Sequence, residues 1–215
     1  MYLPHGIAVK TDVRPGRVNL PEALQKLHSG GFTGLLDFSG TAEDGVLIFE
    51  QGRLTTACTI LPQNGKSERE ALEDIFSRAL AGSFTLGIYR ISNELAVRCR
   101  QVLEGQVVYG GQVMSLLNVE ALVGLVRNVR LTGCLRVYSR DVVSLIFYKD
   151  GHPEGFFHQG SGELTQDAVI SESIALKSGA RVDVIKFQEQ VTQKKEVNLL
   201  KDIDLVACWR QAGGK

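Results

Sequence analysis

The chain has 215 residues, of which 24 are Lys or Arg and 24 are Asp or Glu, so its formal net charge is zero. This balance removes the overall attraction to polyanions, and we expect no nucleic acid among its partners. Hydrophobic residues make up 44% of the chain, which is enough to bury a core. Every apolar run is shorter than the ~18 residues of a membrane span. We therefore expect a cytoplasmic globular protein.

The cysteines stand far apart in the sequence, and neither a CxxC pair nor a histidine cluster accompanies them. Zinc sites and disulfide frameworks use closely or regularly spaced cysteines. We therefore expect reduced thiols, mostly buried, with no metal and no cofactor. The four residues are Cys58, Cys99, Cys134 and Cys208.

An internal repeat organises the chain. Thr33-Gly34 aligns with Thr132-Gly133, 99 positions later, and the alignment continues without a gap. Few residues are identical, but apolar positions and turn glycines agree between the two copies. Self-similarity of this kind predicts two structural units of the same design.

The first copy begins with a short helix. Asn19 can cap its N-terminus, Glu22 follows three positions later, and Gly30-Gly31 ends it. Two strands follow, at 35–38 and 46–49. Both are apolar enough to lie in a sheet that is buried on both faces.

A hairpin, a second helix and a closing strand complete each copy. Gly52 and Gly151 stand where a tight turn requires a positive φ, and the chain returns through a third strand. Ser67 and Glu70 form a capping box before the second helix. The second copy offers a helix over 165–178 at the corresponding place.

The predicted fold class is therefore α+β, with two tandem repeats that each contain a helix, strands with a hairpin, a second helix and a closing strand. The connector and the tail each show apolar residues at helical spacing. These two amphipathic faces should be buried, either across the repeats or at a subunit contact, which would allow a homodimer. The predicted divisions are an N-terminal extension (1–17), the first repeat (18–92), a connector (93–114), a second, divergent repeat (115–188), and a C-terminal amphipathic helix and tail (189–215).

Four motifs of the first copy resemble the DUF4388 family, also called PATAN, which occurs in bacterial regulators and is often fused to response-regulator receiver domains. The motifs are Thr33-Gly34-Leu35-Leu36, Leu47-Ile48-Phe49-Glu50-Gln51-Gly52-Arg53-Leu54-Thr55-Thr56-Ala57, Glu70-Ala71-Leu72 and Gly82-Ser83-Phe84-Thr85. The resemblance covers residues 20–87 well and 117–187 loosely. It implies a non-catalytic module that acts through protein contacts in signal transduction.

On this basis we expect an adaptor or scaffold without catalytic residues, whose partner is a receiver-domain protein, a kinase or a small GTPase. Arg53, at the hairpin tip, is the preferred contact residue, since loops on rigid scaffolds often carry function. His152 is at the second hairpin. Phe156 and Phe157 would either fill the interface between the repeats or form a partner pocket.

Two alternatives remain open. The chain could be a sensor that binds a small molecule or a nucleotide between the repeats, for which the Gly-rich segments at 105–111 and 160–162 are the only indication. It could also be a hydrolase that uses His158 and Ser161, which would require a carboxylate on the histidine and hydrogen-bond donors near the serine.

Overall fold

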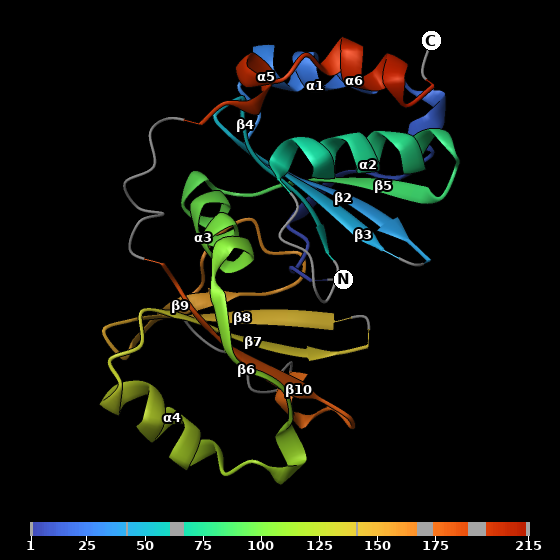
Figure 1. The fold of residues 1–215 in the computed structure, drawn as a ribbon. Coiled ribbons are helices and arrows are strands. Elements are labelled where there is room, and N and C mark those ends of the chain that lie inside the picture. Colours follow the sequence, from blue (N-terminus) through green and yellow to red (C-terminus); the bar gives the residue numbers. More distant parts are fainter. Residues whose placement is uncertain are drawn as a thin grey trace. The chain divides into compact units, whose positions relative to one another are not determined.

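The computed structural model describes residues 2–41, 43–60, 67–140, 142–166, 174–188 and 197–213. The chain forms two compact units (Figure 1). The first unit consists of Gly6–Arg100 with Lys195–Lys215, and the second of Met1–His5 with Gln101–Lys194. Each contains a five-stranded antiparallel sheet with helices, which confirms the predicted α+β fold and its tandem repeat.

The first unit has the strand order β1-β5-β2-β3-β4. Its elements are β1 (Ile7–Val13), the 3-10 turn η1 (Pro15–Arg17), α1 (Leu20–Ser29), β2 (Gly34–Gly40), β3 (Asp44–Glu50), β4 (Arg53–Ile60), α2 (Glu68–Leu80), β5 (Phe84–Arg90), α5 (Leu199–Asp202) and α6 (Leu205–Gln211). The helix α3 (Asn93–Glu104) carries the chain from the first unit into the second.

The second unit repeats this order as β6-β10-β7-β8-β9. Its elements are β6 (Gln106–Val113), the 3-10 turn η2 (Met114–Leu116), α4 (Val119–Asn128), β7 (Gly133–Ser139), β8 (Val142–Lys149), β9 (His152–Phe157), the 3-10 turn η4 (Ile174–Leu176) and β10 (Arg181–Lys186). The helix expected over 165–178 falls largely on 167–173, which lie outside the described residues.

The edge strands β1 and β6 were not foreseen, because their sequences fall in the predicted extension (1–17) and connector (93–114). Most side chains of both strands are exposed, so they lack the apolar alternation by which a half-buried strand is recognised. Both also pair irregularly with their neighbours, β5 and β10. Such bulges twist an edge strand away from the geometry that a further strand would need.

The helix caps and turns follow the sequence prediction. Asn19 accepts a hydrogen bond from the Glu22 amide at 3.2 Å, and Ser67 and Glu70 form both bonds of the capping box. Gly52 and Gly151 have φ values of 79° and 81° and follow residues that also have positive φ, as in a type I′ hairpin.

The helices α1 and α4 end in the same hydrogen-bonded motif. In α1 the amide of Phe32 donates to the carbonyl of Leu27, and a residue with positive φ, Gly31, precedes Phe32. In α4 the amide of Leu131 donates in the same way, but the residue with positive φ is Arg130, at 48°. This Schellman ending prefers glycine, because a side chain in the left-handed region is strained.

Each terminal segment belongs to the unit that is distant from it in the sequence: the N-terminal residues to the second unit and the C-terminal residues to the first. In the second unit, the His5 carbonyl accepts from the Gly160 amide at 2.7 Å, and the His5 amide donates to Gln159. In the first unit, α6 packs against α1 and α2 (Figure 1), and the ring of Trp209 meets that of Phe76 edge to face, with 5.3 Å between the centroids. The C-terminal segment thus belongs to the first core, which is formed on one face of the sheet by α1, α2, α5 and α6.

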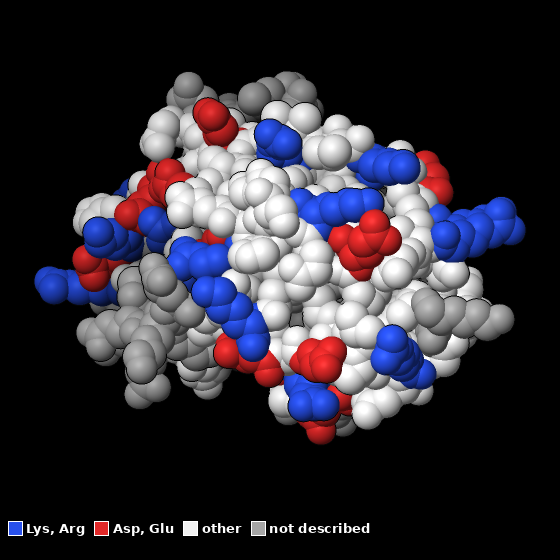
Figure 2. All heavy atoms as spheres, turned by 90° about the horizontal axis from the view of Figure 1, so that it is seen from above, with Lys and Arg blue, Asp and Glu red and all other residues white. Residues whose placement is uncertain are grey.

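Charges are mixed on the surface. Figure 2 shows Lys and Arg interspersed with Asp and Glu over one face of the molecule, as the net charge of zero suggests. Among the described residues, no helix combines the length and the apolar character needed to span a bilayer.

Candidate functional site

The residues predicted to bind a partner lie on the two return strands. Arg53 is the first residue of β4 and is half-buried, whereas His152 begins β9 and is exposed. Phe156 is half-buried and stacks on His158 with 5.9 Å between ring centroids. Phe157 is fully buried, so it contributes to the core and offers no surface to a partner.

The side chains of the hydrolase alternative are engaged in local hydrogen bonds. His158 Nδ1 lies 2.8 Å from the hydroxyl of Ser144, a buried residue of β8. The hydroxyl of Ser161 donates to the Glu163 carbonyl at 2.6 Å within its own loop. This arrangement differs from a triad, in which the serine hydroxyl bonds to the histidine.

The clearest surface feature is the helix α4, whose apolar side chains are largely uncovered. Its sequence, VEALVGLVRN, is amphipathic: Glu120, Arg127 and Asn128 form its polar side, and Leu122 and Val126 face the core of the second unit. Val126 alone of its ten residues is buried. Val119 is 50% exposed and Leu125 40%, and Val129, just beyond the helix, is 59% exposed.

Comparison with α1 shows what is different. Val119 and Val123 correspond to Leu20 and Leu24 in the 99-residue repeat, and both leucines are only 1% exposed. In the first unit α6 packs against α1 and α2, and Leu20 and Leu24 are buried in the core that these helices share. No described helix of the second unit contacts α4 in that way.

We define the α4 surface as the side chains of Leu116, Val119 and Val123, which follow one another on one side of the helix. Leu125 and Val129 lie on the other side of α4, because the two positions from Val123 to Leu125 turn the helix by about 200°. Leu116 precedes the helix and is 83% exposed, while Val123 is half-buried. Complete burial of a Val or Leu side chain contributes about 1.5–3 kcal/mol. Because the residues of the α4 surface are on average about half exposed, covering them would contribute roughly 1 kcal/mol each.

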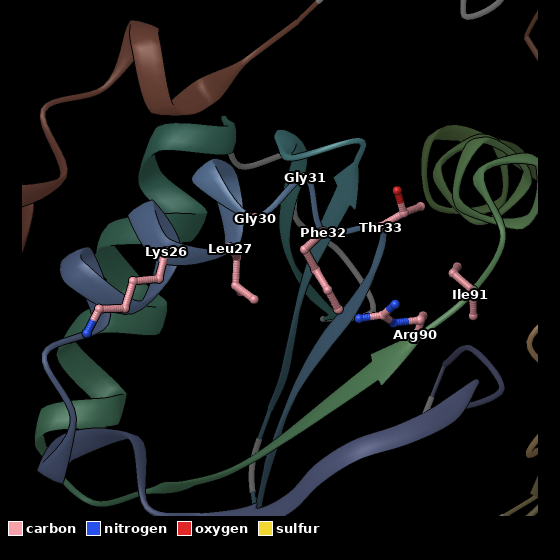
Figure 3. Close-up of a pocket in the computed structure, with 8 residues that line it drawn as sticks. All are labelled: Lys26, Leu27, Gly30, Gly31, Phe32, Thr33, Arg90 and Ile91. Atoms are coloured by element: carbon pink, nitrogen blue, oxygen red, sulfur yellow. The ribbon is translucent and has the colours of Figure 1, made fainter.

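A pocket of about 420 Å³ lies in the first unit where α1 ends (Figure 3). It is lined by Lys26, Leu27, Gly30, Gly31, Phe32, Thr33, Arg90 and Ile91. The Arg90 guanidinium is directed toward the Phe32 ring, with 6.0 Å between Cζ and the centroid. Lys26 extends away from the ring and pairs with Glu22 at 2.7 Å. The pocket therefore offers one cation beside an aromatic ring.

The same place differs between the repeats. Lys26 and Gly30 of the pocket correspond to Leu125 and Val129, which lie on the other side of α4 from the α4 surface. One helix end thus carries a hollow next to a guanidinium, and the other carries exposed aliphatic side chains.

Two buried ion pairs were missed by the sequence analysis. In the second unit Arg136 Nε donates to Asp183 Oδ2 at 2.9 Å, and the guanidinium lies between the rings of Tyr2 and Tyr138, at 3.9 and 4.4 Å. The second pair, Arg100 with Glu50, anchors α3 to β3 at 2.9 Å. A single charged residue inside each of two apolar strands, as at 136 and 183, is the signal that could have indicated the first pair.

The thiols are poorly suited to nucleophilic chemistry. Burial raises the pKa of Cys58 to about 12 and also raises that of Cys99, so both are protonated near neutral pH. Within the described ranges, no group of three or more His, Cys, Asp or Glu side chains gathers as metal ligands would.

Comparisons with protein-family models, curated proteins and solved structures found no match to this chain. The α4 surface and the pocket at the end of α1 are therefore interpreted from their own geometry.

Proposed function

We propose that this chain is a non-catalytic interaction module that serves as an adaptor or scaffold in bacterial signal transduction. The observation that carries the proposal is the exposure of Leu116 and Val119 beside the half-buried Val123 on one side of α4. Contiguous exposed apolar surface on a folded protein commonly marks a site of protein association. The α4 surface is accordingly the proposed binding site.

The signalling context comes from the resemblance of the first copy to DUF4388. The hairpin and capping residues on which this resemblance rests are held as such motifs require, with Gly52 in a tight turn and Ser67 in a capping box. Membership of that family, a cytoplasmic location, and a receiver-domain protein, kinase or small GTPase as partner are parts of the proposal.

Affinity capture from the native cell extract tests this function. The full chain serves as bait beside Val119→Glu, which places a charge in the α4 surface. Leu125→Glu is the matched control, because it places the same charge at an exposed position on the other side of the same helix. We expect a signalling protein to be recovered with the wild type and the control and lost with Val119→Glu. Equal recovery with all three baits would contradict the proposal.

The pocket at the end of α1 supports a second candidate function, the sensing of a small anion. Its volume is in the range of ligand sites, and a guanidinium beside an aromatic ring suits a carboxylate or phosphate that is joined to an apolar group. Gly30→Val would fill the hollow with the residue type found at the equivalent position of the second unit, Val129.

Thermal unfolding in the presence of nucleotides and organic acids tests the sensor. A ligand of this site should raise the Tm of the wild type and leave the Tm of Gly30→Val and Arg90→Ala unchanged. If no compound raises the Tm of the wild type, or if Gly30→Val responds equally, the pocket is not a ligand site.

A further inference from the structure

We infer that the α4 surface binds an amphipathic, acidic helix of another protein, an inference that rests on the proposed function and names the class of its partner. The exposed side chains lie on a helix and on the residues that flank it. Their shape, the way the first unit covers the equivalent helix, and the charges around them each indicate the kind of occupant.

The first unit shows which element covers this kind of helix. There α6 contacts both α1 and α2 and contributes Leu205, Cys208 and Trp209 to the core, all of them buried. The opposite side of α6 faces solvent, where Val206 is 48% exposed. The element that covers α1 is thus a short amphipathic helix with an aromatic residue on its buried side, and it shares one core with Leu20 and Leu24.

The second unit presents the same framework to an occupant. Asn118 caps α4 through the Ala121 amide at 3.0 Å, as Asn19 caps α1, and both helices end in the same motif. Val119 and Val123 stand where Leu20 and Leu24 receive α6. Rows of side chains on one helix fit the grooves of another, so a helix can cover these positions efficiently.

A strand would be a poorer occupant. Strand addition requires a regular free edge, and the edge strand β6 of this unit pairs irregularly with β10, with register shifts around Val184. The exposed apolar groups of α4 also carry no free backbone hydrogen-bonding groups with which a strand could pair, since they are side chains of a helix.

The charges on α4 favour an acidic partner. Arg127 and Arg130 are exposed at the C-terminal end of the helix, whereas Glu120 is the acidic residue of its first turn. An exposed ion pair contributes only about 0.2–1 kcal/mol and is weakened by salt. The two arginines therefore favour acidic over basic partner helices, while the apolar contacts supply most of the affinity.

Site-specific photo-cross-linking identifies the occupant. Benzoylphenylalanine replaces Val119 in the full chain, and a second preparation carries it at Leu125, on the other side of α4, as the control. After irradiation in the native extract, the cross-linked segment is sequenced by mass spectrometry and synthesised as a peptide. Its affinity for the chain is then measured by fluorescence anisotropy at low and high salt, and its helicity by circular dichroism.

We expect the Val119 cross-link to lie in a segment with a negative net charge and apolar residues at i, i+3, i+4 and i+7. The peptide should gain helicity on binding, bind at least tenfold more weakly to Val119→Glu, and lose affinity both in Arg127→Glu and at high salt. A cross-link to an extended segment, or to a second copy of this chain, would overturn the inference. A cross-link to an extended segment of another protein would leave the proposed function standing. Absence of any cross-link to another protein would count against both the inference and the proposed function.

Discussion

Removing the guanidinium of Arg136 should destabilise the second unit more than neutralising the carboxylate of Asp183. In Arg136→Met, Asp183 would keep the Gly111 amide at 2.6 Å and the Tyr138 hydroxyl at 3.5 Å, but it would be a buried charge without a counter-ion. Losses of this kind cost roughly 3–5 kcal/mol. In Asp183→Asn the guanidinium remains between Tyr2 and Tyr138, so we expect a cost of about 1–3 kcal/mol.

A double variant separates the charge effect from the loss of packing. Arg136→Met with Asp183→Leu removes both charges and keeps apolar volume, so it should be more stable than Arg136→Met alone. Urea unfolding followed by circular dichroism measures these free energies, and Trp209, which lies in the first unit and is the chain's one tryptophan, reports on that unit by fluorescence. A double variant that is no more stable than Arg136→Met alone would refute the reasoning.

Three further outcomes follow from single positions. Arg130→Gly should stabilise the second unit by roughly 0.5–1 kcal/mol in urea unfolding, because it relieves a positive φ, and Gly31→Arg should have the opposite effect in the first; a loss on Arg130→Gly would contradict this. Trp209→Ala should cost the first unit about 3–5 kcal/mol by circular dichroism, and a cost below 1 would mean that α6 is not part of that core. With a pKa of about 12, Cys58 should be alkylated slowly by iodoacetamide at pH 8 and about tenfold faster per pH unit up to that value; rapid labelling at pH 8 would be inconsistent with its burial.

The features that the sequence predicted correctly are those made by neighbouring residues. The Asn19 cap, the Ser67 capping box and the turn at Gly52 depend on hydrogen bonds or dihedral angles within a few positions. Their residue types are therefore visible in a short window. The repeat was equally accessible, because the same apolar positions recur after 99 residues.

What could not be predicted depends on residues far apart in the chain. Asp183 meets Arg136 across neighbouring strands, 47 positions away, and nothing near either residue indicates the other. The helices α1 and α4 have similar caps and apolar content, and the difference in their exposure arises because α6 covers only α1. The sequence around Phe156 and Phe157 likewise does not indicate that Phe157 is buried and Phe156 only half-buried.

The exchange of terminal segments bears on how the protein is made. Translation produces Gly6–Arg100 before the second unit, yet the core of the first unit includes Leu199, Leu205 and Trp209, which are synthesised after the described elements of the second unit. The second unit, which needs only Met1–His5 from elsewhere, has all of its described elements once Lys186 has emerged. Of the two repeats, the one translated earlier is therefore completed later, and until α5 and α6 have been translated the side chains of α1 that α6 covers are exposed, as those of α4 are.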